Sequence, residues 1–233
     1  MTIQEMHYDF KMKLNKIDSE QYRNLRIPEI DWKLNEALEI FIKNNAEPYQ
    51  VPFYGFEKNQ RSIDNIRPLV VENQLITLNG SVAPLPNDYM FYVSSYVIMK
   101  KGKCKDRRGR VLIKQHDDMF EESPFDRSSY EWSEINATFD SAGLRLYIPE
   151  GITLDGLHLT YIRKHAYIHN AQDFLPGSKY KLPNGVELTG RQDCELPEHT
   201  HREIVDIAVY IASMDLEQQT AQFKQSKLEL NKL

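Results

Sequence analysis

Residues 196–217 read LPEHTHREIVDIAVYIASMDLE, the longest strongly helical pattern in the chain. Pro197 fits the first helical position, because its missing N–H is not needed there and its fixed φ is already helical. Glu198 and Glu203 follow, and carboxylates in the first turns suit the positive end of the helix dipole. Apolar residues then recur at three- and four-residue spacings, at Ile204, Val205, Ile207, Ala208, Ile211, Ala212 and Leu216. This stripe is wider than a surface helix needs, so we expect the helix to be covered on more than one side. We therefore assign a helix-bundle and assembly face to Ile204, Ile207, Ala208, Ile211 and Leu216.

The N-terminal part contains the helices that we expect to provide this cover. One helix is predicted over residues 3–25, with one face made of Ile3, Met6, Phe10, Leu14 and Ile17. A second is predicted over residues 28–43, with Pro28 in its first turn and a stripe of Ile30, Leu34, Ala37, Leu38 and Phe41. A shorter helix over residues 58–66 would end before Pro68. The expected partner face for the C-terminal stripe is Ile30, Leu34, Leu38 and Phe41.

Between residues 70 and 167 the pattern changes from helical to strand-like. Segments rich in aromatic and β-branched residues, separated by turn residues, predict strands over 75–78, 89–99, 111–116, 144–148 and 157–163. Residues 175–190 contain Pro-Gly and Pro-Asn-Gly and predict an irregular connection or a small hairpin.

The order of helices, then strands, then a helix predicts an α+β fold. In it the N- and C-terminal helices pack together as a small bundle, and an antiparallel β-sheet or sandwich is inserted between them. The expected parts are an N-terminal helical part (1–69), an inserted β domain (70–168), an irregular connection (169–195), and a C-terminal helix and tail (196–233).

Composition excludes few function classes. Hydrophobic residues make up 41% of the chain and charged residues 27%, which is ordinary for a soluble globular protein. The net charge of −5 gives no overall attraction to nucleic acid or anionic membrane, so any electrostatic function must be local. The start has no apolar signal core and no stretch is long enough to span a bilayer, so we expect a protein made in a cytoplasm. Cys104 and Cys194 are far apart in sequence, and we expect no disulfide framework.

No motif in the sequence predicts catalysis, a cofactor or a metal site. His199 and His201 are two positions apart, which on a helix turns them to different faces, so they cannot bind one metal from a regular helix. Cys104 and His116 are only two ligands, too few for a zinc site. Phosphate-binding loops and nucleophile–base signatures are missing as well. We therefore expect a protein that is not an enzyme.

Two neighbouring segments have opposite charge. KKGKCKDRRGR (100–110) has one acid and seven basic residues, which are Lys100, Lys101, Lys103, Lys105, Arg107, Arg108 and Arg110. It is predicted to form a hairpin tip between two strands. DDMFEESPFD (117–126) has five acids, which are Asp117, Asp118, Glu121, Glu122 and Asp126. Three interpretations stay open: two solvated loops, sequence-independent binding of nucleic acid at the basic tip, or a basic tip that meets the acidic loop of the next subunit in a ring.

Seven segments taken together form a recognisable pattern. They are KIDSEQYRNLRIPEIDWKLNEALEIFIK (16–43), LPNDYMFYVSSYV (85–97), KGKC (101–104), HDD (116–118), SPFDRSSYEW (123–132), LRLYIPEGITLDGLHLTYIRKHAYI (144–168) and CELPEHTHREIVDIAVYIASMDLE (194–217). In content and order they resemble virion ring proteins encoded by crAss-like and related phages of Bacteroidetes, over roughly residues 17–217. More distantly, the chain is similar to the head-to-tail adaptors of short-tailed phages, in which terminal helices enclose a β insertion.

The resemblance implies a structural protein of the virion head–tail connector, made in the host cytoplasm. It would dock beneath the portal protein in a twelve-fold ring and offer a platform for the next tail or ring protein. Double-stranded DNA would pass through the completed channel without sequence-specific binding, and no cofactor or membrane is implied. In such adaptors the C-terminal tail often reaches the portal, so the implied portal contacts are Phe223, Leu228, Leu230 and Leu233.

Two other functions remain possible on the sequence. A β-sheet module could bind carbohydrate or a host surface through a stacking platform of Tyr89, Tyr92, Tyr96, Tyr130 and Trp132, although aromatic residues in strands are more often core residues. An accessory protein could instead bind nucleic acid without sequence preference through residues 100–110.

Overall fold

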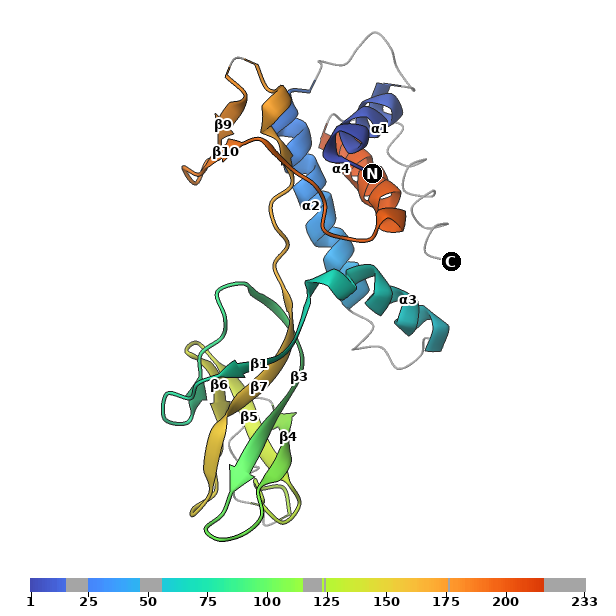
Figure 1. Cartoon of the computed structure of the whole chain (residues 1–233). Helices are drawn as coiled ribbons and strands as arrows, with labels where there is room; N and C mark the ends of the chain where they lie inside the picture. The colour runs from blue at the N-terminus through green and yellow to red at the C-terminus, as the bar shows by residue number, and fades with distance from the viewer. Residues whose placement is uncertain (16–24, 47–55, 115–122, 124, 176, 216–233) are drawn as a thin grey trace. The chain divides into compact units, whose positions relative to one another are not determined.

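A computed structural model describes residues 1–15, 25–46, 56–114, 123, 125–175 and 177–215. Its secondary structure is mixed α+β, as predicted: four α-helices, a curled seven-stranded sheet and two small two-stranded sheets (Figure 1). Contacts divide the chain into two compact units. Residues Met1–Leu69 and His165–Leu233 form the first, called the helical unit, and Val70–Lys164 form the second, called the β unit.

The helical unit contains the helices α1 (Ile3–Asn15), α2 (Ile27–Ala46), α3 (Phe56–Ile66) and α4 (His201–Asp215). Helix α4 packs against both α1 and α2, and α3 packs against α2 (Figure 1). The apolar residues of the predicted stripes are buried, as expected: Ile3, Met6, Phe10, Leu14, Ile30, Leu34, Ala37, Leu38, Phe41, Ile204, Val205, Ile207, Ala208 and Ala212. Ile211 is half-buried, while Ile17 and Leu216 lie outside the described residues.

Helix α4 starts later than the sequence predicts. Pro197 has an extended backbone, with φ −58° and ψ 144°, and precedes a short 3₁₀ turn over Glu198–Thr200. The Pro197 carbonyl accepts hydrogen bonds from the backbone N–H of Thr200 at 3.0 Å and from the Thr200 hydroxyl at 2.8 Å. Pro197 is therefore the N-cap residue of this turn. The prediction that it is the first helical residue is wrong, because its backbone is extended and its carbonyl accepts the hydrogen bonds from Thr200.

A buried carboxylate joins the elements of the helical unit. Asp31 of α2 is fully buried, and its Oδ1 lies 2.7 Å from Nε2 of His7 in α1. Its Oδ2 accepts hydrogen bonds from the Tyr180 hydroxyl at 2.7 Å and the Asn170 backbone N–H at 3.1 Å. Burial is the main cause that raises the pKa of the Tyr180 phenol, and the hydrogen bond to Asp31 adds to it. Tyr180 therefore remains a hydrogen-bond donor. Asp31 thus links α1 and α2 to the segment that returns from the β unit.

That returning segment forms the two small sheets. Strand β8 (His169–Asn170) pairs with β11 (Arg191–Gln192), and β9 (Lys179–Lys181) pairs with β10 (Glu187–Thr189), all antiparallel. The prediction of a small hairpin within residues 175–190 is confirmed by the β9–β10 pair.

Asp173 makes the stability of this region depend on pH. Its carboxylate accepts hydrogen bonds from Gln4 at 2.8 Å, Asn170 at 2.9 Å and Arg191 at 2.7 Å, and these lower its pKa from 3.8 to about 2. Because the pKa of Asp173 is lower in the folded state, its carboxylate stabilises the protein at pH values above its pKa in the unfolded chain. This stabilisation is lost as the pH falls toward 2.

We therefore expect Asp173→Asn to lower the free energy of unfolding at pH 7 and to have almost no effect at pH 2. The side chain is partly exposed, so the difference should stay below about 1 kcal/mol. Urea unfolding at both pH values measures it, with Asp155→Asn in the β unit as the control. An equal loss at both pH values would contradict the assignment.

The β unit contains one sheet with the strand order β1-β7-β3-β4-β5-β6-β2. The strands are β1 (Val70–Ile76), β2 (Val82–Ala83), β3 (Tyr89–Lys100), β4 (Arg107–Ile113), β5 (Glu134–Asp140), β6 (Gly143–Leu146) and β7 (Thr153–Arg163). All neighbours are antiparallel except β4 and β5, which are parallel. The prediction of a purely antiparallel sheet is therefore wrong at this pair. Residues 114–133 lie between the two strands, and this length exceeds the dozen or so residues that a parallel crossover needs.

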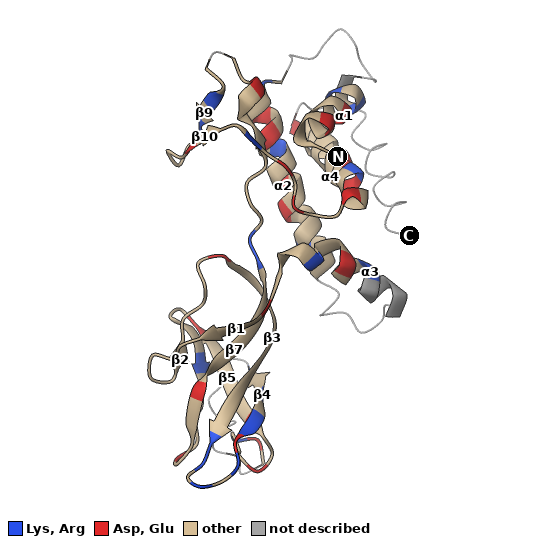
Figure 2. Cartoon of the chain, viewed as in Figure 1, with Lys and Arg blue, Asp and Glu red and all other residues tan. Residues whose placement is uncertain are grey.

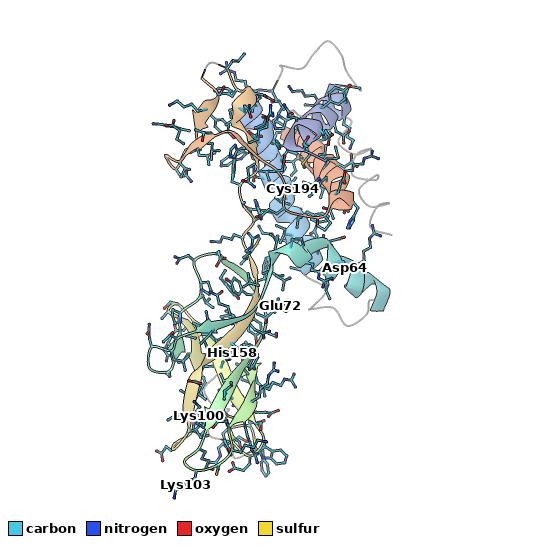
Figure 3. All side chains as sticks on the ribbon, viewed as in Figure 1. Asp64, Glu72, Lys100, Lys103, His158 and Cys194 are labelled. Carbon is cyan, nitrogen blue, oxygen red and sulfur yellow. The ribbon has the colours of Figure 1, made fainter. Side chains whose placement is uncertain are left out.

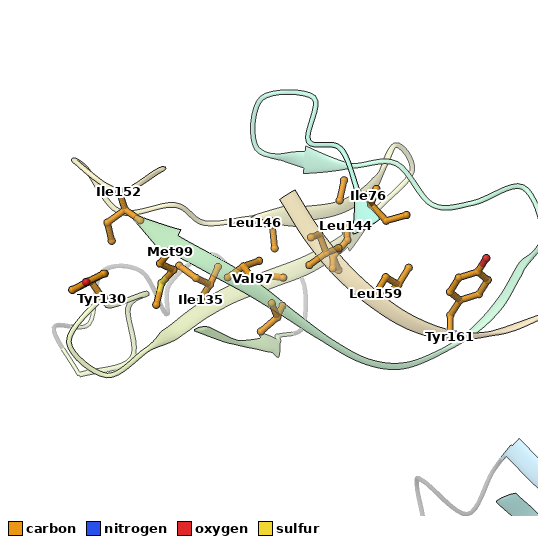
Figure 4. Packing of buried hydrophobic residues seen from close by; sticks show 14 residues of the cluster. Ile76, Val97, Met99, Tyr130, Ile135, Leu144, Leu146, Ile152, Leu159 and Tyr161 are labelled. Atoms are coloured by element: carbon orange, nitrogen blue, oxygen red, sulfur yellow. The ribbon is translucent and has the colours of Figure 1, made fainter. Parts of the chain in front are cut away.

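Every strand of the sheet contributes to one apolar core (Figure 4). Val97 and Met99 of β3, Ile135 of β5, Leu146 of β6 and Leu159 of β7 are all buried in it. Gly109 of β4 is close-packed here, because a Cβ at this position would lie 2.8 Å from Cε of Met99. Since residues alternate between the faces of a strand, the neighbours of these core residues lie on the opposite face of the sheet.

Candidate functional site

The seven basic residues of segment 100–110 do not form one loop. Lys100 is the last residue of β3, and Arg107, Arg108 and Arg110 belong to β4, so the turn comprises only residues 101–106. The predicted hairpin tip is therefore corrected to a shorter turn, because β4 begins four residues earlier than its expected start. Figure 2 shows the basic residues gathered at this end of the sheet.

One subset of these residues is organised around Tyr130. Nζ of Lys101 lies 5.3 Å and the Arg107 guanidinium carbon 4.9 Å from the centroid of its ring. The Tyr130 hydroxyl donates a hydrogen bond to the Lys105 carbonyl at 2.5 Å. Cations over an aromatic face are attracted to its quadrupole, so Tyr130 draws the turn and β4 together.

Part of the positive charge at this end of the sheet is compensated by neighbouring acids. Nζ of Lys101 lies 2.9 Å from Oε1 of Glu131, and this hydrogen bond raises the pKa of Lys101 and lowers that of Glu131. Nζ of Lys100 lies 3.2 Å from Oδ2 of Asp155. Arg107 donates hydrogen bonds to the carbonyls of Tyr130 and Glu131. These contacts indicate that Lys100, Lys101 and Arg107 shape the turn, while Lys103 and Lys105 are exposed to solvent.

The second subset, Arg108 and Arg110, lies on the face of the sheet opposite the core. The Arg108 guanidinium carbon lies 3.6 Å from the centroid of the Tyr96 ring. The Tyr96 ring also stacks on His158 of β7, with centroids 4.5 Å apart and an interplanar angle of 3°. His158 is labelled in Figure 3. Neither arginine forms an ion pair with an Asp or Glu among the residues that the structure describes. This subset is the exposed basic site of the β unit.

The partner that the sequence suggested for the basic segment is mostly outside the described residues. Of the five acids, only Asp126 is described, and it is exposed. Asp117, Asp118, Glu121 and Glu122 lie outside the described residues, as does His116. The implied portal contacts Phe223, Leu228, Leu230 and Leu233 also lie outside them.

The five aromatic residues predicted as a carbohydrate platform do not share one surface. Tyr130 is buried in the core, and Tyr89 and Tyr92 are packed against it. Tyr96 is covered by Arg108 and His158, so Trp132 alone has a largely exposed ring, at 81%. The structure therefore does not gather these five rings into one exposed platform, because Tyr130, Tyr89 and Tyr92 pack in or against the core.

The helical unit contains an apolar groove that was not predicted from the sequence. It has a volume of about 420 Å³, and its walls are mainly apolar: Leu25, Pro28, Trp32, Leu182, Pro183 and Ala212. Trp32 of α2 is 51% exposed there, although it follows the fully buried Asp31 in sequence. The salt bridge between Lys33 and Asp215 lies at the same groove. The groove was hard to foresee because α2, α4 and the β9–β10 hairpin come together only in the folded unit.

Metal and membrane features are few in the described part of the chain. There, no three His, Cys, Asp or Glu side chains lie close enough together to hold a metal ion. His199 Nε2 lies 2.9 Å from Oδ1 of Asn65, and both ring nitrogens of His201 contact backbone carbonyls. Cys104 and Cys194 are free thiols in different units, and burial raises the pKa of Cys194 to about 11. None of the described helices is long and apolar enough to cross a membrane.

A scan against known protein families finds no match to the chain. A search of the curated proteins finds no match either.

Proposed function

We propose that this chain is a structural virion protein whose copies form a ring below the portal at the head–tail connector. In this proposal the terminal helices pack as a bundle that holds the β unit as an insertion. The ring completes the channel for DNA ejection and offers a platform for the next tail or ring protein. The proposal starts from the seven segments that resemble phage ring proteins.

The apolar groove of the helical unit is the observation that supports it best. Its lining is mainly apolar, and Trp32, which borders it together with Pro28 and Pro183, is half-exposed. Met214, near the end of α4, is 54% exposed. An exposed tryptophan at the edge of an apolar groove is typical of protein interfaces, where tryptophan often dominates the binding energy. We assign a second copy of this chain as the occupant of the groove, since a ring subunit must present a contact surface to its neighbours.

Replacing Trp32 with glutamate is expected to prevent assembly without unfolding the chain. The native mass of the wild-type protein, measured over a concentration series together with negative-stain images, should show closed rings of about twelve subunits. Trp32→Glu should shift the mass to monomers and weaken association at least about tenfold, because a carboxylate would be desolvated in the groove. Its far-UV circular dichroism should stay unchanged, since Trp32 is half-exposed.

Trp132 offers a matched control, because it is the other tryptophan of the chain, is exposed, and belongs to the β unit. Trp132→Glu should assemble like the wild type. If the wild-type chain stays monomeric at every concentration, self-assembly of the ring is excluded. If both tryptophan variants assemble normally, the groove is not the contact.

A further inference from the structure

The outer face of the β unit contains a stacked group of side chains that the ring proposal does not use. Val97 and Met99 of β3 and Leu157 and Leu159 of β7 point into the core. Tyr96 and His158 alternate with them and lie on the other face of the sheet. They are cross-strand partners in the β3–β7 pairing, so the backbone register places their rings side by side.

The Tyr96 ring holds Arg108 in a fixed orientation. His158 stacks on the ring at 4.5 Å and Arg108 lies at 3.6 Å from its centroid, so the two occupy opposite faces of it. A guanidinium stacked on an aromatic ring keeps its N–H groups directed outward in its own plane. Because the stack already restricts the side chain, less conformational entropy is lost when Arg108 binds a ligand.

Arg110 provides a second cation beside this stack. It is the cross-strand partner of Tyr96, and both arginines border a shallow cavity of about 300 Å³. Asn73 and Ser94 also border the cavity, and both can donate hydrogen bonds. Glu134 lies next to Arg110 in the β4–β5 pairing, yet no ion pair joins the two. The described lining of the cavity contains no carboxylate.

We propose that this cavity binds the oxyanion of a phosphate group, with Arg108 and Arg110 as the ligating residues. Tyr96 and His158 are positioning residues, since they act through Arg108. The guanidinium groups of Arg108 and Arg110 are planar and have no carboxylate partner among the described residues. Each can donate a pair of parallel hydrogen bonds to the oxygens of a phosphate group. The proposal does not depend on ring formation, and it assigns anion binding to the face of the sheet instead of the turn.

A phosphate group could come from a nucleic-acid backbone or from a free phosphate, and two probes distinguish these sources. Calorimetry with inorganic phosphate tests the free anion, and fluorescence anisotropy with a short mixed-sequence duplex DNA, at several salt concentrations, tests the polymer. Tighter binding of the duplex with a steep salt dependence would identify the backbone as the source. Binding of inorganic phosphate at least as tight as that of the duplex would identify the free anion.

Substitutions separate the two arginines from the general charge of the segment. Arg108→Gln and Arg110→Gln should each weaken binding about tenfold, for whichever of the two probes binds the wild-type chain. For duplex DNA, each should also reduce the salt slope by about one. Lys103→Gln removes one charge from the exposed turn and should change the affinity less than about twofold. Arg110→Lys keeps the charge without the fork and should bind with intermediate affinity.

The positioning role of Tyr96 has its own test. Tyr96→Phe keeps an aromatic face for Arg108 and should bind like the wild type. Tyr96→Leu should lose several-fold in affinity, while its thermal unfolding midpoint stays close to that of Tyr96→Phe. Equal affinities of the two variants would overturn the role of the stack.

Two results would overturn the site itself. The first is that neither probe binds the wild-type chain. In that case binding of a peptide of residues 115–126 would identify the face as a contact between protein chains. The second is that Arg108→Gln and Arg110→Gln weaken binding no more than Lys103→Gln.

Discussion

Replacing Asp31 with alanine is expected to destabilise the helical unit by about 3–5 kcal/mol, because a buried hydrogen-bond network would lose its central acceptor. Asp31 is fully buried, and its carboxylate lies 2.7 Å from Nε2 of His7. It also accepts hydrogen bonds from the Tyr180 hydroxyl at 2.7 Å and the Asn170 backbone N–H at 3.1 Å. Alanine would leave three buried polar groups without their acceptor, and each such group costs about 1–3 kcal/mol. Since a domain has only about 5–15 kcal/mol of stability in total, much of the helical unit would unfold at physiological temperature.

Denaturant unfolding followed by far-UV circular dichroism measures this loss. Glu39→Ala is the matched control, because Glu39 lies in the same helix and forms only an exposed salt bridge with Lys43 at 3.6 Å. It should change the free energy of unfolding by less than about 0.5 kcal/mol. Asp31→Asn keeps one oxygen acceptor and should be intermediate. An Asp31→Ala protein as stable as the Glu39→Ala protein would show that the network does not hold the unit together.

The β unit should be most sensitive at Gly143, where alanine is expected to cost about 3 kcal/mol or more. Gly143 begins β6 with φ +136°, a backbone conformation that other residues rarely adopt. A Cβ here would lie 2.2 Å from the carbonyl oxygen of Ala83 and 3.0 Å from Cα of Pro84. Both are backbone atoms, so no side-chain rotation can relieve the overlap. The pairing of β2 with β6, in which Ala83 faces Leu144, would be displaced.

Gly102→Ala separates this overlap from the backbone strain. Gly102 also has a positive φ, +52°, but a Cβ there would meet no atom within 4 Å. Gly102→Ala should therefore cost about 1 kcal/mol, from strain alone. Hydrogen exchange of the Leu146 amide, which bonds the Ser81 carbonyl at 2.8 Å, reports the β2–β6 edge directly. Equal stability of the two variants, with equal protection of this amide, would exclude the close approach of Gly143 to β2.

The helices were the most predictable part of the chain, because their signal is local. The stripes of α1, α2 and α4 repeat every three or four residues, and this spacing alone places them on one side of a helix. Strand β3 was equally clear, since more than half of its residues are aromatic or β-branched.

Strand β5 was not predicted, although it is central to the sheet. Its sequence EINATFD contains Asn, Ala and two acids, residues that are uncommon in strands. It forms because β4 and β6 pair with it on both sides, and neither pairing can be read from the segment itself. For the same reason the sequence did not show that β4 and β5 are parallel.

The sequence by itself determined the α+β class, the main helices with their buried stripes, and the concentration of positive charge between residues 100 and 110. These follow from composition and short-range periodicity, which need no knowledge of distant contacts. Only the tertiary structure decided that Asp31 is a buried acceptor. It also decided that Lys101 is paired with Glu131, while Arg108 is stacked on Tyr96, whose other face is occupied by His158. The physical reason is that such contacts join residues far apart in sequence, which only helix packing and strand register bring together. The energy of a polar or charged side chain depends on these partners, so it cannot be read from the neighbouring sequence.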